Sequence, residues 1–406
     1  MPPTKNRGHK HNIMNPVNDY IKKNWKNTVR TGKEGIGKKL PYPVTVPCMK
    51  EGFTCFFYWD TYFTNLGLMI DNEEQATWNV ENMRSFVEDM GFIPNGNLPV
   101  MFNRSQPPLY PHAVMDLYEK TKDVELLKRH YSAIKTEYSF WMKNRSTAIG
   151  LNQYNSNPTD KEIEDFYVEL KERGAFPSLK KERAEILGYF AEAESGWDFC
   201  YRYDESALNY VQIDLNSILY GTEKAISKIA GLIGESEDAR LFEGLSQKRK
   251  GLINALMRAD DGTYHDYDFV NKKMSPYYSC ASFTPFVFNL SDDAEACKKT
   301  LEKLEQPHGI SAGERIEKTG LQWAYPNMWP PLVYFAYMAL RAVGLNEDAD
   351  RIRKKYLAVV DSVFEKTNDL WEKFNCSNGT VSNSEYSSPS MMGWTAGVYR
   401  YLFEEK

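Results

Sequence analysis

Two carboxylate residues lie in settings that suit a general acid and a general base. Asp198 stands between Trp197 and Phe199 just after a Ser-Gly turn, and Glu372 follows another tryptophan. A carboxyl group packed against aromatic rings loses water, which raises its pKa as a general acid at neutral pH requires. A second, ionised carboxylate across a cleft completes the minimum set for glycoside hydrolysis. Taken singly, Asp198 could equally cap a turn, and Glu372 could be a solvated residue paired with Lys373.

Aromatic rings, carboxylates and amides gather in the loops of this chain. The segments are 57–60, 94–97, 103–108, 195–199, 322–331, 371–375, 385–386 and 393–395. A polyhydroxylated ring requires this combination, because its hydroxyls need hydrogen-bond partners and its C–H faces pack on flat apolar surfaces. The chain has 9 Trp, 26 Tyr and 21 Phe, and we assign most of these rings to helix packing. The repetition of one loop type favours a sugar-binding cleft for the remainder.

Other kinds of active site find little support in the sequence. The chain has no G-x-S-x-G, no glycine-rich phosphate loop and no H-E-x-x-H, and its six His have no convincing catalytic neighbour. Residues 260–266 resemble a calcium loop but lack its spacing, so we interpret them as an Asx turn. The six cysteines are scattered without metal spacing and are expected to be free, mostly buried thiols. We therefore predict no metal and no cofactor.

Apolar residues recur with a helical period of about 3.6 along most of the chain. The expected helices cover 73–90, 124–143, 160–173, 179–191, 205–230, 236–257, 292–304, 329–343, 346–367 and 391–403, with weaker candidates at 17–25, 60–70 and 113–120. Asp123 is a typical N-cap, and Gly344 is a typical stop signal. The best strand candidates, 43–48 and 284–288, are short. The sequence thus predicts an all-α protein.

The helices are expected to form a single domain. No linker rich in Pro, Gly or Ser divides the chain, and no fixed sequence period indicates a solenoid. A closed ring of helical hairpins remains, with unequal loops at one end lining a central cleft. We predict an N-terminal tail and lead-in helix over residues 1–30 and a catalytic domain over residues 31–406.

Composition excludes several classes of protein. The 406 residues include 50 Lys+Arg and 55 Asp+Glu, a net charge of −5, which argues against nucleic-acid binding. A hydrophobic content of 42% supports a large core. We find no apolar stretch long enough to span a bilayer and no apolar region typical of a secretory signal. We expect a cytoplasmic protein that binds a small carbohydrate and neither nucleic acid nor membrane; its oligomeric state stays open.

Several of these segments resemble one known family, and they occur in the same order. Residues 58–63 read YWDTYF, 103–108 read NRSQPP, and 195–199 read SGWDF. Further matches lie at 91–97, 372–375, 385–386 and 393–395. From about residue 50 onward, the chain resembles the trehalase family, glycoside hydrolase family 37, with features of the related family 63 α-glucosidases and mannosylglycerate hydrolases. The resemblance implies an (α/α)6 toroid, in agreement with the predicted helices.

The resemblance also implies roles for particular residues. Asp198 would protonate the glycosidic oxygen and Glu372 would activate a water on the opposite face of the sugar, so that the anomeric configuration inverts; Glu385 is a reserve candidate for the base. The residues that would bind sugar are Tyr58, Trp59, Asp60, Asn103, Arg104, Gln106, Trp197, Arg202, Gln322, Trp323, Glu385 and Trp394. The implied substrate is a small α-glucoside, with trehalose as one candidate.

Some positions depart from the family pattern. Gly52 stands where an arginine is usual, residues 157–160 replace a stretch with Arg and Glu, and Ala324 replaces an Asp. The loss of these charged groups leaves the substrate open between trehalose, another α-glucoside, and a glucosylglycerate or mannosylglycerate. Two other functions are disfavoured. The chain retains both carboxylates, which argues against an inactive sugar-binding protein. Few basic residues lie near Glu372 in the sequence, which argues against a phosphorylase, because that enzyme would bind phosphate there.

Overall fold

Six helical segments contact one another in a closed ring at the centre of the computed structural model. The structure describes residues 15–31, 38–176, 178–204, 206–316 and 320–405. In ring order they are α2 (Tyr58–Asp71), α4 (Tyr110–Thr121), α8 (Ile213–Ile233), α10 (Thr284–Val287) with the 3-10 turn Cys280–Phe283, α12 (Pro330–Ala342) and α14 (Gly393–Glu404). α14 packs back against α2 and closes the ring. Long buried runs in α2, α8 and α12 show that these inner helices are covered on nearly every side.

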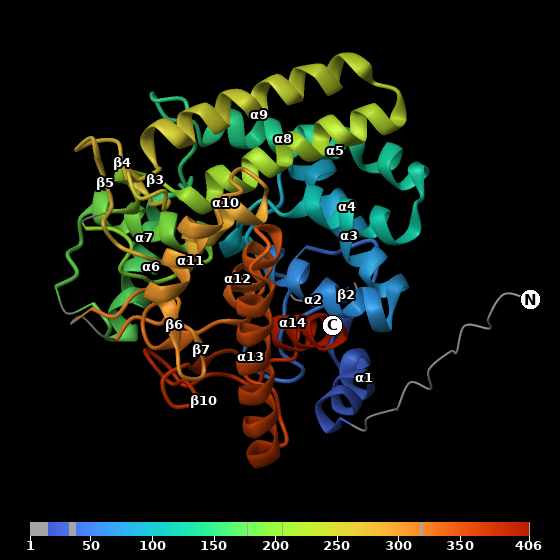
Figure 1. Ribbon diagram of the computed structural model, residues 1–406, viewed down its shortest axis with the longest axis vertical. Coiled ribbons are helices and arrows are strands. Elements are labelled where there is room, and N and C mark those ends of the chain that lie inside the picture. The colour runs from blue at the N-terminus through green and yellow to red at the C-terminus, as the bar shows by residue number, and fades with distance from the viewer. Residues whose placement is uncertain (1–14, 32–37, 177, 205, 317–319, 406) are drawn as a thin grey trace, which may run out of the picture.

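A second layer of helices surrounds the ring. It contains α3 (Glu73–Met90), α5 (Val124–Asn144), α9 (Ser236–Leu256), α11 (Ala294–Leu304), α13 (Asn346–Thr367) and, beside α14, α1 (Pro16–Thr28). These outer helices bury one stripe only; in α9 it consists of Phe242, Ser246, Arg249 and Ile253, at helical spacing. Figure 1 shows the α8–α9 hairpin at the top and the α12–α13 hairpin at the centre. The fold is therefore the predicted single-domain (α/α)6 toroid.

Two further helices form a small lobe with its own apolar cluster. They are α6 (Asp160–Arg173) and α7 (Arg183–Ser195), on the left of Figure 1. The Thr159 side chain and Glu162 form a capping box at the start of α6. The cluster consists of Phe166, Leu170, Phe176, Leu179, Ile186, Phe190, Ala193, Phe199 and Leu321. Because Phe199 belongs to this cluster, the lobe is anchored next to Asp198.

Short strands join the loops in four antiparallel sheets. Two of the sheets have two strands each: β1 (Val29–Arg30) pairs with β2 (Val44–Thr45), and β6 (Glu305–Gln306) pairs with β7 (Gly309–Ile310). A three-stranded sheet contains β3 (Tyr210–Val211), β4 (Tyr267–Asp268) and β5 (Lys273–Met274). The other three-stranded sheet contains β8 (Asn327–Met328), β9 (Phe374–Asn375) and β10 (Thr380–Val381). Met328 pairs with Phe374, and Asn327 pairs with Asn375. This register ties the segment that follows Glu372 to the start of α12.

Two predicted elements differ from the structure. The strand expected at 284–288 is wrong, because Thr284–Val287 is the short helix α10 in the inner ring. A short apolar run buried on every side has no periodicity that separates a strand from a helical turn. The helix expected at 205–230 begins only at Ile213, since residues 207–211 form a 3-10 turn, Ala207–Asn209, and strand β3.

The expectations for residues 260–266 and for the cysteines are confirmed. The Thr263 amide donates to Asp261 Oδ1 at 3.1 Å, as an Asx turn requires, and all six cysteines are free, with five of them buried. Among the described residues, no helix is both long enough and apolar enough to cross a membrane. The expected lead-in helix is present as α1, whereas the tail at residues 1–14 lies outside the described residues; the division after residue 30 stays a prediction.

Candidate active site

A cavity of about 240 Å³ lies where α2, α12 and α14 begin. Trp59 and Asp60 enter its wall from the first turn of α2, Trp329 directly precedes α12, and Trp394 is the second residue of α14. Asp198 enters from the segment after α7. Nine of the residues predicted for the site line the cavity: Asp198, Glu372, Trp59, Asp60, Arg104, Gln106, Gln322, Trp323 and Trp394. Tyr58, Asn103, Trp197, Arg202 and Glu385 are not among the residues that line it.

Tryptophan rings form one continuous side of the cavity. Trp323 stacks on Trp329 with centroids 3.9 Å apart and planes 4° from parallel, and Trp59 lies 5.6 Å from Trp323. Trp394 stands edge-on to Trp329 at 5.7 Å. A Cβ at Gly196 would lie 2.6 Å from a Trp59 ring atom, and the backbone there has φ of 76°, so only glycine fits. The wall offers flat apolar faces to a ligand.

The Asp198 carboxyl group lies at the edge of this wall. Its side chain is 34% exposed, and Arg173 Nη1 lies 3.9 Å from Oδ2. Gln322 Nε2 donates to the Asp198 carbonyl, and the Trp323 amide donates to the Phe199 carbonyl at 3.1 Å, so the segment is held on both sides. Burial raises the pKa of Asp198 to about 6, against the opposing charge of Arg173. A substantial fraction of Asp198 is therefore protonated near pH 6.

The Glu372 carboxylate is buried and surrounded by donors. Lys373 Nζ lies 2.8 Å from Oε2, and the side chains are 0% and 2% exposed, so this ion pair is not the solvated one considered above. The Tyr386 hydroxyl lies 2.7 and 2.8 Å from the two carboxylate oxygens. Burial raises the pKa of Glu372, while Lys373 and Tyr386 favour its charged form. Trp394 Nε1 also donates to the Glu372 carbonyl at 3.0 Å.

Arg202 does not reach the cavity. Its Nη2 forms buried ion pairs with Asp214 at 2.7 Å and Asp266 at 2.8 Å. The guanidinium carbon lies 4.6 Å from the centre of the Trp197 ring, and Trp197 in turn contacts Trp323 at 5.5 Å. Arg202 and Trp197 thus support the tryptophan wall from behind.

Tyr58 and Asn103 also position residues of the wall. The Tyr58 hydroxyl donates to Glu137 at 2.7 Å and accepts from the Tyr110 amide at 2.8 Å, which joins α2 to α4 and α5. Asn103 accepts from Arg104 Nη1 at 2.9 Å and donates to Glu162 at 2.9 Å. Asn103 therefore orients the Arg104 guanidinium.

Glu385 is held by two partners. Its Oε1 lies 3.2 Å from Arg173 Nη1, its Oε2 accepts from the backbone amide of Gln322 at 3.1 Å, and the Glu385 side chain is 1% exposed. Burial raises the pKa of Glu385 to about 7, with Arg173 acting in the opposite direction. The residue has φ of 66°, a conformation that is uncommon outside glycine and often found at functional sites.

Comparison with known proteins places the chain in a family. A model of the trehalase family matches residues 5–406. The chain belongs to the trehalase family. This glycoside hydrolase is similar in structure to neutral trehalase Nth1 from Saccharomyces cerevisiae, with a TM-score of 0.76 and 23% identity over 95% of this chain and 79% of that chain.

Two other solved structures share the fold of this trehalase-family enzyme. One is the GH63 mannosylglycerate hydrolase from Thermus thermophilus in complex with Tris and D-glycerate, with a TM-score of 0.68 and 15% identity over 96% of this chain and 100% of that chain. The other is a bacterial glucoamylase complexed with acarbose, with a TM-score of 0.53 and 13% identity over 87% of this chain and 49% of that chain. At these identities, the likeness concerns the fold alone.

Two charged residues of the cavity wall were not predicted from the sequence of this enzyme, Glu169 and Arg173 on α6. Arg173 Nη2 lies 2.9 Å from Glu169, one helical turn away, and Arg173 also reaches Asp198 and Glu385. A Glu-Arg pair at i,i+4 is typical of a solvated helix face, so the spacing by itself gives no signal. Their place in the cavity follows from the docking of the α6–α7 lobe.

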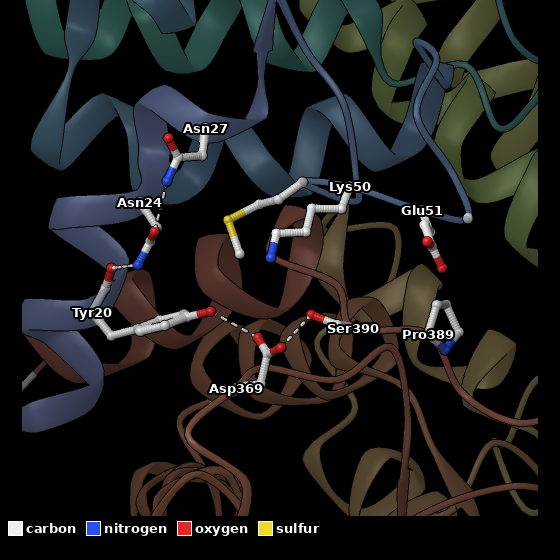
Figure 2. A pocket seen from close by; sticks show the side chains of 10 residues that line it. Tyr20, Asn24, Asn27, Lys50, Glu51, Asp369, Pro389 and Ser390 are labelled. Atoms are coloured by element: carbon white, nitrogen blue, oxygen red, sulfur yellow. Dashed lines mark hydrogen bonds between the residues drawn. The ribbon is translucent and has the colours of Figure 1, made fainter.

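Gly52, one of the departures from the family pattern, borders a second cavity of about 1000 Å³. Figure 2 shows Asp369 in this cavity, where it accepts from the hydroxyls of Tyr20 at 2.8 Å and Ser390 at 2.7 Å, with Lys50 pointing inward. Gly52 has φ of 86°. An arginine at this position would be strained. The position also borders the second cavity and not the one that Asp198 and Glu372 line.

Proposed function

We propose that this enzyme is an inverting hydrolase of small α-glucosides, trehalose being one candidate, and that it acts in the cytoplasm. The observation that carries the proposal is the pair of carboxyl groups in one aromatic cavity, Asp198 and Glu372, which differ in how closely a cation approaches them. Burial raises the pKa of both groups, that of Asp198 to about 6, but Arg173 lies 3.9 Å from Asp198 whereas Lys373 lies 2.8 Å from Glu372. One carboxyl group suited to donating a proton and one suited to accepting it are the pair that inversion requires.

Each of these groups has its own role in the reaction. Asp198 donates its proton to the glycosidic oxygen as the bond to the anomeric carbon breaks. Glu372 takes a proton from the water that attacks this carbon from the opposite face. The tryptophan wall holds the apolar face of the sugar, and Asp60 and Gln106 offer acceptors and donors to its hydroxyls. Lys373 favours the ionised form of Glu372, against burial, and this is the form that takes the proton.

Glu372 is the better candidate for the base than Glu385. Glu372 lines the cavity, whereas Glu385 is not among the residues that line it and is bound by Arg173 and the Gln322 backbone amide. A base must be within hydrogen-bond reach of the attacking water, which lies in the cavity. We therefore assign Glu385 to holding Arg173 and the Gln322 segment in place.

Proton NMR of an early time course tests the stereochemistry. The substrate should be an α-glucoside whose leaving group is not a sugar, so that only one anomeric signal grows. We expect β-glucose to form first and then mutarotate. Early release of α-glucose would contradict inversion, and absence of turnover on a panel with trehalose, kojibiose, nigerose and isomaltose would contradict the substrate class.

The pH profile should depend on Arg173. Because Asp198 acts in its protonated form, kcat/KM falls as the pH rises above about 6, the pKa of this carboxyl group. Arg173 lowers that pKa against burial, so Arg173→Met should raise it and move the basic limb to higher pH. Arg183→Met, which removes an exposed arginine from α7, is the matched control and should leave the limb in place. A limb that stays in place or moves to lower pH in Arg173→Met would refute this role.

A further inference from the structure

We propose that the leaving-group end of the catalytic cavity has an apolar lip, which makes the enzyme favour α-glucosides whose leaving group carries an apolar chain. The lip consists of four side chains that line the cavity: Phe53, Phe57, Val100 and Met101. This inference rests on the proposed function, because it places the leaving group on the side of the acid Asp198. It names a substrate class within the small α-glucosides.

The exposure of the catalytic groups shows which end of the cavity opens to solvent. The Glu372 side chain is 2% exposed, and Trp394, which donates to the Glu372 carbonyl, is buried as well. The Asp198 side chain is 34% exposed, and that of Arg173 beside it is 26% exposed. Because the acid protonates the glycosidic oxygen, the leaving group lies on its side of the bond. The glucosyl residue therefore occupies the closed end, and the leaving group extends past Asp198 toward solvent.

The apolar lip lies at this open end. The Val100 carbonyl accepts from Arg104 Nη1 at 3.3 Å. Burial lowers the pKa of Arg104, and the charge of Asp198 acts against burial, so Arg104 and Val100 lie within reach of the acid. Val100 is also the most exposed large apolar side chain among the described residues, at 62%. A leaving group that extends from Asp198 toward solvent would thus cover it.

The four side chains of the lip form one surface. The rings of Phe53 and Phe57 lie edge to face with centroids 5.6 Å apart. A Cβ on Gly96 would lie 2.5 Å from Met101 Sδ and 3.5 Å from a Phe57 ring carbon, so Met101 and Phe57 meet above this glycine. Val100 directly precedes Met101 in the same 3-10 turn. A chain of several methylene groups can therefore remain in contact with apolar atoms along its length.

Packing of the core does not account for these side chains. Phe57, Val100 and Met101 belong to neither of the two apolar clusters of the described residues, although Phe53 packs against the larger one. Single exposed apolar residues are common, but a contiguous group that lines a cavity is typical of a ligand site. A sugar would cover this group with its C–H face only, whereas an alkyl chain would release water from more of it.

A series of alkyl α-glucosides tests the preference. The ethyl, butyl and hexyl compounds release alcohols of nearly equal acidity, so they differ in chain length alone. We expect kcat/KM to rise from the ethyl to the hexyl compound by about tenfold or more, because each fully buried methylene group contributes about fourfold. The matching alkyl 1-thio-α-glucosides resist hydrolysis. They should inhibit hydrolysis of α-glucosyl fluoride more strongly as the chain lengthens, which measures the preference without turnover.

Two matched variants locate the preference on the lip. Val100→Asn places an amide there and should lower the hexyl-to-ethyl ratio of kcat/KM by about threefold or more. Val168→Asn makes the same change at a valine of α6 that is 45% exposed and is not among the residues that line the cavity, so it should leave the ratio unchanged. Because both side chains are exposed, neither change should prevent folding.

Three results would overturn the inference: a wild-type hexyl-to-ethyl ratio of one or less, equal ratios in Val100→Asn and Val168→Asn, or thioglucoside inhibition constants that do not depend on chain length. Absence of α-glucosyl fluoride hydrolysis would instead overturn the proposed function.

Discussion

Asp198→Asn should lower kcat/KM for trehalose and other α-glucosides with a sugar leaving group by about 10²–10⁴-fold. The amide has no proton to donate to the glycosidic oxygen, while its shape keeps the packing of the segment between Trp197 and Phe199. Hydrolysis of α-glucosyl fluoride should fall much less, because fluoride leaves with little help from an acid. The ratio of the two losses is the diagnostic measurement.

Folding can be separated from chemistry in this variant. The Asp198 side chain is 34% exposed, and its backbone carbonyl, which accepts from Gln322, is unchanged by the substitution. We expect the thermal unfolding midpoint to stay close to that of the wild type. Equal losses on fluoride and on sugar leaving groups would contradict the role of Asp198 as the acid, as would full activity on both.

Glu372→Gln should abolish hydrolysis of both kinds of substrate, with a loss of about 10²–10⁴-fold or more on each. A good leaving group does not replace the base, because the attacking water still has to lose a proton. The matched control is Tyr386→Phe, which removes one hydrogen bond to Glu372 and leaves the carboxylate in place. Its activity loss should be much smaller. If Glu385→Gln abolished the fluoride reaction while Glu372→Gln retained it, the two assignments would have to be exchanged.

Glu372→Gln also leaves Lys373 buried without an opposite charge, which costs about 3–5 kcal/mol when one partner of a buried pair is removed. The double variant Glu372→Gln with Lys373→Met removes both charges and should recover much of that stability without recovering activity. Thermal unfolding followed by circular dichroism measures the first effect, and fluoride release measures the second. Activity recovered in the double variant would contradict the role of Glu372.

Much of the architecture could be read from local patterns. Helix periodicity and caps predicted most of the helices, because each depends on residues three or four positions apart; Asp123, for example, caps α5 by accepting from the Glu125 amide. The prediction of short buried elements failed because it, too, depends only on residues close together in the sequence. Thr284–Val287 has no exposed face, so its local pattern does not separate a helix from a strand.

The candidate site was predicted in part. Aromatic and polar loop motifs led to nine residues of the cavity wall, but sequence order does not say which side of that wall a residue occupies. Arg202 binds Asp214 and Asp266 behind Trp197, because three buried charges are stable only when they pair with one another. Arg173 in turn enters the cavity only because the lobe formed by α6 and α7 docks beside Phe199.

The sequence by itself determined the helical fold and the family, and it singled out Asp198 and Glu372 as the candidate acid and base, because these depend on spacing and on contiguous motifs. The tertiary structure decided which charges act on those carboxylates. Lys373 follows Glu372 directly and is equally suited to solvent by its type, yet both are buried as a pair; Arg173 and Glu169 reach Asp198 from another helix. Burial and the distances between charged groups depend on segments far apart in the chain, so the raised pKa of Asp198 arises only when the toroid closes.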